Sequence, residues 1–127
     1  MAFSARFQLA VEEEGCRTVF LRPLGEFDLA AVARVEDALG RVFEAPTTSR
    51  VVFDLRRLTF LDSSGLRTLL RANQRARAGA LELVVVKPRG TAGRVFTLTR
   101  VGEELRMVDD ESKAEQNRPR LRVVSGD

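Results

Sequence analysis

The sequence predicts a single α/β domain with a mixed, mostly parallel sheet of four to five strands that begins with an antiparallel hairpin. Residues 7–12 alternate between apolar and polar, and the mostly apolar segment 18–21 follows a polar turn, so the two segments predict the hairpin. Apolar runs follow at 51–55 and 81–86, as expected for strands buried on both faces. Amphipathic helical patterns alternate with these strands, which favours parallel pairing through right-handed connections.

The N-terminal hairpin is predicted to turn at residues 13–15, where two glutamates precede a glycine. Pro23 cannot donate to a β-ladder, so we expect it near a strand end or edge. Residues 25–28, Gly-Glu-Phe-Asp, are then predicted to end the strand. Cys16 is interpreted as an ordinary residue at the start of the second strand.

The first helix is predicted over residues 29–43, with Asp28 as its N-cap. Apolar residues recur along it at helical spacing and predict one core-facing stripe, made of Val32, Val35, Leu39 and Val42. Residues 45–49 contain a proline and three hydroxyl residues, which predicts the loop to the next strand.

A second helix is predicted over residues 63–78, directly after the junction FLDSSG at 60–65. Asp62 or Ser63 is suited to cap this helix, and Gly65 permits close packing. Its buried stripe is formed by Leu66, Leu69 and Leu70. Arginines recur every four residues and predict an exposed row, formed by Arg67, Arg71 and Arg75. This row is interpreted as a solvated face, and its functional alternative is an electrostatic docking strip for an acidic partner.

The strand at 81–86 is stopped by Pro88, and a short helix is predicted over 94–99. That helix is expected to point Val95, Phe96 and Leu98 inward. The preceding segment RGTAGR, at 89–94, lacks the lysine and the spacing of a P-loop, so we expect a plain loop. A last edge strand is predicted over 105–108.

The domain is expected to span residues 1–110. Residues 111–127 are mostly charged and polar, which predicts a flexible tail. Within this tail, 121–124 is the one segment suited to docking on the domain.

The composition is that of an ordinary globular domain, with 127 residues, 44% of them hydrophobic and 31% charged. A chain of this length buries a core without metals or disulfides. A single cysteine excludes an internal disulfide, and no apolar stretch reaches the roughly 20 residues of a membrane span. We therefore expect a cytoplasmic location and no membrane span.

The residue types that are missing also exclude several functions. The sequence contains no histidine, so a Ser-His-Asp triad and a His-based metal site are both impossible within it. The net charge is only +3, and the sequence has neither tryptophan nor tyrosine, which argues against a nucleic-acid-binding surface. Glu26 and Asp28 could form a general acid/base pair, but a turn and an N-cap explain them better. We therefore expect neither enzyme activity nor a cofactor.

The DSSG junction has two interpretations. Helix capping alone accounts for Asp, Ser and Gly at a strand-to-helix junction. The functional alternative is a phosphorylation switch at Ser64, in the first turn of a helix, where phosphate is readily accepted. A phosphate would add about −1.5 to −2 charges near Asp62 and Asp28 and would repel a partner packed there.

Three stretches together resemble the STAS domain family, in particular bacterial anti-sigma factor antagonists. They are GEFDLAAV at 25–32, VVFDLRRLTFLDSSGLRTLL at 51–70 and RVFTLTRVGEELRMVD at 94–109. With the hydrophobic spacing between them, the resemblance covers about residues 5 to 110. It implies a mixed sheet with helices largely on one side.

The resemblance also implies a mechanism. Such antagonists bind an anti-sigma factor that is also a serine kinase, and they free a sigma factor while unphosphorylated. The kinase inactivates the antagonist by phosphorylating a motif serine, and a phosphatase reverses this. By position the target is Ser64, with the neighbouring Ser63 as the second choice. The implied partner-binding residues are Glu26, Asp28, Asp62, Ser63, Ser64, Gly65, Leu66, Arg67 and Arg71.

The sequence departs from the family pattern at two positions, with Phe27 where leucine is more usual and Arg67 where a small residue is common. One alternative function is a structural STAS subunit, never phosphorylated, in a stressosome-like or lipid-transport assembly. Another is an enzyme with a serine nucleophile, which the absence of histidine and of a lysine near the motif disfavours. The chain is expected to be a monomer or a weak dimer.

Overall fold

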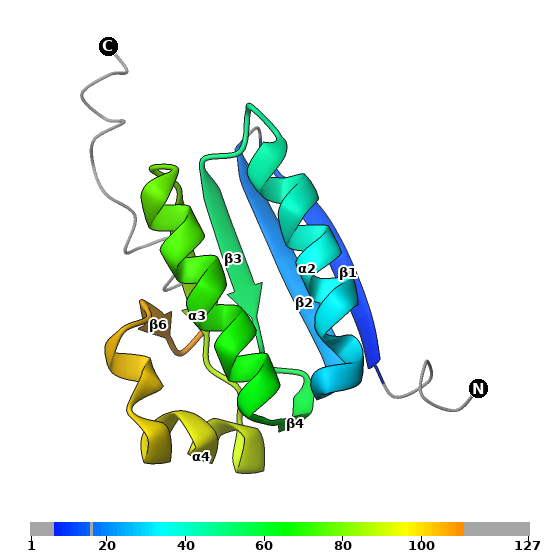
Figure 1. Cartoon of the computed structure of the whole chain (residues 1–127), viewed down its shortest axis with the longest axis vertical. Helices are drawn as coiled ribbons and strands as arrows, with labels where there is room; N and C mark the ends of the chain where they lie inside the picture. Colours follow the sequence, from blue (N-terminus) through cyan, green and yellow to red (C-terminus); the bar gives the residue numbers. More distant parts are fainter. Residues whose placement is uncertain (1–6, 16, 111–127) are drawn as a thin grey trace.

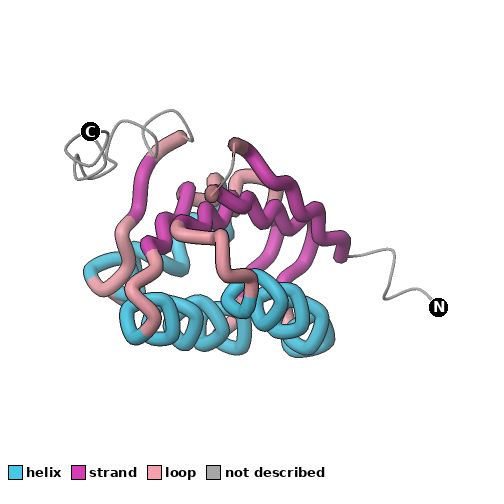
Figure 2. The backbone as a smooth tube through the Cα atoms, turned by 90° about the horizontal axis from the view of Figure 1, so that it is seen from above, coloured by secondary structure: helices cyan, strands magenta, loops and turns pink. Residues whose placement is uncertain are grey.

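The computed structural model describes residues 7–15 and 17–110, which form one twisted sheet with its helices on one face (Figures 1 and 2). The chain order is β1 (Phe7–Glu14), β2 (Thr18–Phe27), α2 (Leu29–Glu44), β3 (Arg50–Asp54), β4 (Leu58–Leu61), α3 (Ser63–Ala78), β5 (Glu82–Val86), α4 (Gly90–Thr99), η1 (Val101–Glu103) and β6 (Met107–Val108).

The sheet has six strands in the order β1-β2-β3-β5-β6, and β4 pairs with the far end of β2. Strands β1 and β2 form the predicted antiparallel hairpin, while all the other pairs are parallel. The predicted α/β class and the one-sided helix layer are therefore confirmed (Figure 2). The strand number exceeds the predicted four to five because β4 was not expected.

Strand β2 is longer than predicted. Its first part, from Thr18 to Leu21, pairs with β3, and its last part, from Gly25 to Phe27, pairs with β4. Pro23 lies between these two parts. The prediction that residues 25–28 end the strand was wrong: Gly25 has φ +99°, the register shifts there, and pairing continues to Phe27.

The main core lies between the sheet and the helices α2 and α3, which Figure 1 shows side by side across it. The predicted stripe of α2 is confirmed, with Val35, Leu39 and Val42 buried and Val32 partly buried. In α3, Leu66 and Leu69 are buried, and Leu70 packs partly buried against them. The strands contribute the residues of one pleat face, such as Val51 and Phe53.

Helix α4 begins at Gly90 rather than at residue 94, so the expectation of a plain loop over 89–94 was wrong. A Cβ at Gly93 would lie 2.7 Å from the carbonyl oxygen of Pro88, so a glycine lets the helix begin this close to the proline. The inward position expected for Leu98 was also wrong, since its side chain is 80% exposed. Phe96 is buried, and a residue two positions on points to the other side of a helix.

The opposite face of the sheet carries a second buried apolar cluster, made of Phe20, Val52, Val84, Val86 and Val108. At its edge, Asp54 at the end of β3 is almost fully buried. Its Oδ2 accepts from Arg22 Nη1 at 2.7 Å and from Arg56 Nη2 at 2.9 Å. Its Oδ1 accepts from the backbone and side chain of Arg56 at 3.1 and 2.9 Å. Burial by itself raises the pKa of Asp54, but these hydrogen bonds outweigh it and hold the pKa below the usual value.

The other end of β3 carries a second buried charge that the sequence pattern did not predict. Arg50 is 2% exposed, and its Nε lies 3.2 Å from a carboxylate oxygen of Glu82 on β5. Arg106, just before β6, binds the same carboxylate. The central strand is therefore apolar in its middle and ionic at both ends.

Three expectations fall outside the described residues: the role of Cys16, the tail at 111–127 and the docking of 121–124. Within the described part of the chain, no helix combines the length and apolar character needed to cross a membrane.

We predict that Asp54→Asn lowers the free energy of unfolding at pH 7 by about 2 kcal/mol, because it leaves two arginines facing a neutral amide. The folded pKa of Asp54 is depressed, so the carboxylate stabilises the fold above its unfolded pKa of about 3.9. This contribution is lost as the pH falls through the lower folded pKa. The difference between wild type and variant should therefore shrink on acidification below about pH 4.

Urea unfolding at neutral pH and across the acidic range measures this difference. The matched control is Asp37→Asn, since Asp37 is exposed on α2. A wild-type advantage that is absent at neutral pH, or that stays unchanged in acid, would contradict the assigned role of Asp54.

Candidate partner-binding site at the start of helix α3

The candidate site lies where β2 and β4 end side by side, at the edge of the sheet where α2 and α3 both begin (Figure 1). The last paired residues of the two strands are Phe27 and Leu61. The next residue in each chain segment is an aspartate, Asp28 or Asp62, and each aspartate precedes a helix. Parallel pairing thus brings together two strand-to-helix junctions that are more than thirty residues apart in sequence.

Both aspartates cap their helices. Asp28 Oδ1 accepts from the backbone N–H of Ala30 at 3.1 Å, as predicted. Asp62 Oδ1 accepts from the N–H groups of Ser64 at 2.9 Å and Gly65 at 3.2 Å. Of the two capping candidates for α3, Asp62 is therefore the one that caps, and neither motif serine is used for this purpose.

The two serines differ in exposure. Ser63 is exposed, whereas Ser64 is only partly exposed. Among the described residues, neither hydroxyl has a hydrogen-bond partner. The backbone around them is fixed, because the carbonyl of Ser64 accepts from Thr68 Oγ1 at 3.0 Å. The site thus presents two unengaged hydroxyls on an ordered helical turn.

Gly65 brings the helix close to the strands, as the sequence suggested. A Cβ at this position would lie 2.5 Å from Leu61 Cδ1 and 3.0 Å from the carbonyl oxygen of Phe27. That same carbonyl accepts from the N–H of Asp62 at 3.4 Å. Leu66 is 7% exposed, so its side chain belongs to the core rather than to an exposed surface.

The predicted partner-binding residues fall into two groups. The strand ends and the start of α3 bring together Glu26, Asp28, Asp62, Ser63, Ser64 and Gly65. Arg67 is exposed one turn further along α3. Arg71 lies one turn beyond that and faces α2, where its Nη1 is 3.6 Å from Glu36 Oε2. The arginine row is therefore not simply a solvated face.

Sequence analysis missed a set of exposed apolar side chains at this end of the domain. Leu29, immediately after Asp28, is 72% exposed, and Phe60, paired with Glu26, is 44% exposed. Leu98, 80% exposed, lies on α4, which is at the same end (Figure 1). One available signal was that Leu29 falls outside the apolar stripe of α2. Exposed apolar groups beside polar ones are typical of protein–protein contact surfaces.

The carboxylates of the site are not grouped as metal ligands. Within residues 7–15 and 17–110, no three acidic, cysteine or histidine side chains are grouped so as to hold a metal ion. Its chemistry is that of hydroxyls, capped helix termini and apolar contacts.

A model of the STAS domain matches residues 9–114. This chain belongs to the STAS domain family. An anti-sigma F factor antagonist of Lysinibacillus sphaericus is 28% identical over 85 residues, which cover 67% of this STAS domain protein and 73% of that relative.

Two solved structures extend the comparison. An anti-sigma factor antagonist from Mycobacterium paratuberculosis superimposes with a TM-score of 0.73 at 25% identity, covering 87% of this chain and 92% of that one. The phosphorylated form of SpoIIAA, a Bacillus cell fate determinant, gives a TM-score of 0.67 at 23% identity and covers 87% and 100% of the two chains. The resemblance first seen in the three sequence stretches is therefore confirmed at the level of family and fold.

We predict that Asp62→Ala lowers the free energy of unfolding by about 1 kcal/mol, because two N–H groups of α3 lose their acceptor. Asp62→Asn, which keeps a side-chain oxygen at the same position, should stay close to wild type. Thermal or urea unfolding compares the three proteins. An equal loss in both variants would show that the cap hydrogen bonds are not what Asp62 contributes.

We predict that Gly65→Ala destabilises the domain by about 1–3 kcal/mol, because the added methyl group overlaps Leu61 and the Phe27 backbone. The matched control is Gly40→Ala in α2, where a Cβ meets nothing within 4 Å. That change should stabilise the domain by up to about 1 kcal/mol through helix propensity. Denaturant unfolding of both variants measures these changes. An unchanged free energy of unfolding in Gly65→Ala would contradict the close packing at this position.

Proposed function

We propose that this STAS domain is an anti-sigma factor antagonist controlled by phosphorylation of Ser64. In its unphosphorylated form it binds an anti-sigma factor that is also a serine kinase, and a sigma factor is released. The kinase ends this binding by phosphorylating Ser64, and a phosphatase restores it. The domain is thus a kinase substrate in the bacterial cytoplasm and not itself an enzyme.

One observation carries the proposal: Asp62 caps α3 through its own carboxylate, which leaves the serine hydroxyls of the motif unengaged at a surface flanked by exposed Leu29 and Phe60. A serine that served as the cap would use its hydroxyl for this hydrogen bond. A hydroxyl that supports nothing in the fold can be modified without unfolding the domain. The exposed apolar side chains nearby suit a partner that covers it.

The charge balance supports a switch that acts on binding. A phosphate brings about −1.5 to −2 charges to an edge that already holds the carboxylates of Asp28 and Asp62. A partner packed against the neutral hydroxyl would then meet like charges and a desolvation cost. The relatives support the same role, because both the Lysinibacillus protein and the Mycobacterium structure are anti-sigma factor antagonists.

A second candidate is a structural STAS subunit of a larger assembly, in which the serine is never modified. The exposed apolar residues favour it equally, since Leu29, Phe60 and Leu98 suit a permanent interface as well as a reversible one. The two candidates differ in their dependence on Ser64.

We expect one phosphate on Ser64 when the purified protein is incubated with ATP and the matching anti-sigma factor kinase from the same genome. Intact mass and peptide mapping identify the residue. Ser64→Ala should remain unmodified and keep partner binding, whereas Ser64→Asp should weaken binding at least about tenfold through the added negative charge.

Ser63→Ala is the matched control, because it removes the neighbouring, more exposed hydroxyl. It should still be phosphorylated. Modification that is lost in Ser63→Ala and kept in Ser64→Ala would transfer the switch to Ser63. Absence of any phosphate, together with binding that is indifferent to both serines, would favour the structural subunit.

A further inference from the structure

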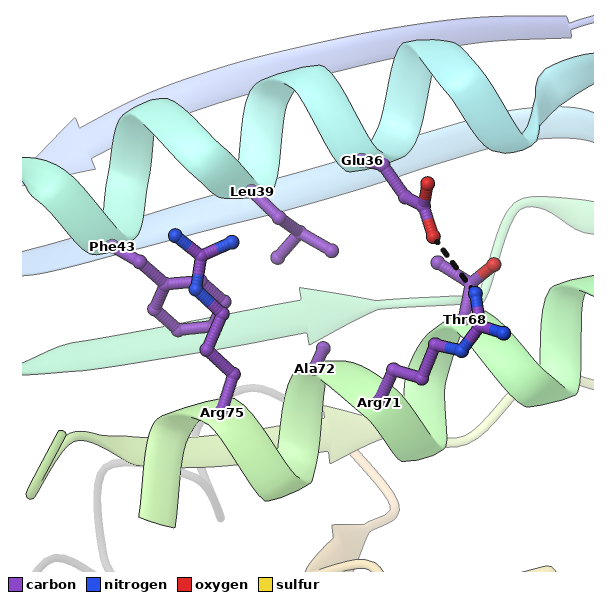
Figure 3. A pocket seen from close by; sticks show the side chains of 7 residues that line it. All are labelled: Glu36, Leu39, Phe43, Thr68, Arg71, Ala72 and Arg75. Atoms are coloured by element: carbon purple, nitrogen blue, oxygen red, sulfur yellow. Dashed lines mark ion pairs between the residues drawn. The ribbon is translucent and has the colours of Figure 1, made fainter. Parts of the chain in front are cut away.

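A groove of about 300 Å³ lies between α2 and α3, on the helix-covered side of the domain (Figure 3). The two helices run side by side in the same direction (Figure 1). The groove is lined from residues 36 to 43 of α2 and from residues 68 to 75 of α3, about two helical turns of each. The family resemblance implied a partner-binding role for Arg71, but the sequence did not indicate a groove between the two helices.

The floor of the groove is apolar. Leu39 from α2 and Ala72 from α3 are buried at its base, and the small side chain of Ala72 keeps the space between the helices open (Figure 3). Phe43 forms one wall, with the guanidinium of Arg75 stacked 4.9 Å from its ring centroid. An apolar side chain of a ligand would therefore meet hydrocarbon below and a cation at the rim.

The rim on the α3 side is strongly basic. Residues 63–78 contain four arginines and no acidic residue, and both Arg71 and Arg75 line the groove. Among the described residues, Glu36 is the only acidic one that lines the groove, and its Oε2 lies 3.6 Å from Arg71 Nη1. Both partners of this pair are largely exposed, so the pair contributes little and can be exchanged for a carboxylate of a ligand.

The near end of the groove lies about one helical turn along α3 from the motif serines. Thr68, which lines its near end, donates its hydroxyl to the backbone carbonyl of Ser64. A partner that covers the start of α3 therefore reaches the groove within one helical turn.

We propose that this groove binds an acidic amphipathic helix of about two turns, with one apolar anchor over Ala72 and carboxylates facing Arg71 and Arg75. The helix belongs to the anti-sigma factor that recognises Ser64, so the inference rests on the proposed function for the identity of the partner. Apolar grooves with charged rims bind amphipathic helices in this manner. Charge complementarity selects an acidic one.

The test measures binding of the purified full chain to the anti-sigma factor kinase in the absence of ATP. The double variant Arg71→Glu, Arg75→Glu should weaken binding by at least about tenfold, and the wild-type affinity should fall as salt is raised. Arg77→Glu is the control: it reverses one charge, half the change of the double variant, at an exposed position of α3 that does not line the groove, and it should stay within about threefold of wild type. Unfolding curves confirm that all variants fold.

The outcomes separate this inference from the phosphorylation proposal. Binding that is lost in Ser64→Asp but unchanged in the groove double variant overturns the groove proposal alone. Binding that depends on the groove but not on Ser64→Asp contradicts the switch and supports the groove. An equal loss in Arg77→Glu overturns the groove proposal by showing that only overall charge matters.

The experiments also detect a different occupant of the groove. Sedimentation of the protein alone at increasing concentration reports a second copy of the chain. Self-association that the double variant abolishes would assign the groove to that copy and overturn the proposal. Failure of every anti-sigma factor kinase of the genome to bind the wild-type protein would overturn both proposals.

Discussion

The close contact between the start of α3 and the paired ends of β2 and β4 determines the arrangement of the candidate site. Gly65 lies so near to Leu61 and to the Phe27 carbonyl that any larger residue would move the helix away. That contact sets how closely the first turn of α3 approaches the strand ends, and with it the positions of the two serines. The serines are therefore placed by a packing constraint on one side of the turn, while their hydroxyls remain unengaged on the other.

Both faces of the sheet that carries this site are packed with buried side chains. Its helix-covered face is a continuous apolar core, whereas the opposite face joins an apolar cluster to the buried carboxylate of Asp54. Asp54 ends β3 and holds Arg56, at the start of the connection from β3 to β4. The connection that begins at Arg56 leads through β4 directly into α3.

The sequence was sufficient for the parts of the fold that depend on local pattern. Helical periodicity and capping residues located α2 and α3 to within a residue, and the apolar runs located β3 and β5. The failures were long-range in origin. Nothing in the order of residues shows that Gly25 lets β2 bend and continue, or that the short strand β4 pairs with the far end of β2. At the site, the motif was visible in the sequence. The exposed apolar side chains around it, and the orientation of Arg71 toward α2, depend on how the helices pack and so could not be predicted from the sequence.

The parallel course of α2 and α3 has an electrostatic consequence. Both helices begin at one edge, so the positive ends of two macrodipoles converge there, and each is already balanced by one carboxylate, Asp28 or Asp62. An uncapped helix terminus stabilises an added phosphate through hydrogen bonds from its free N–H groups. Here Asp28 and Asp62 already accept hydrogen bonds from N–H groups of the two helix termini. A phosphate on Ser64 would therefore gain little from the two capped helix termini and would project its field outward, toward whatever approaches the domain.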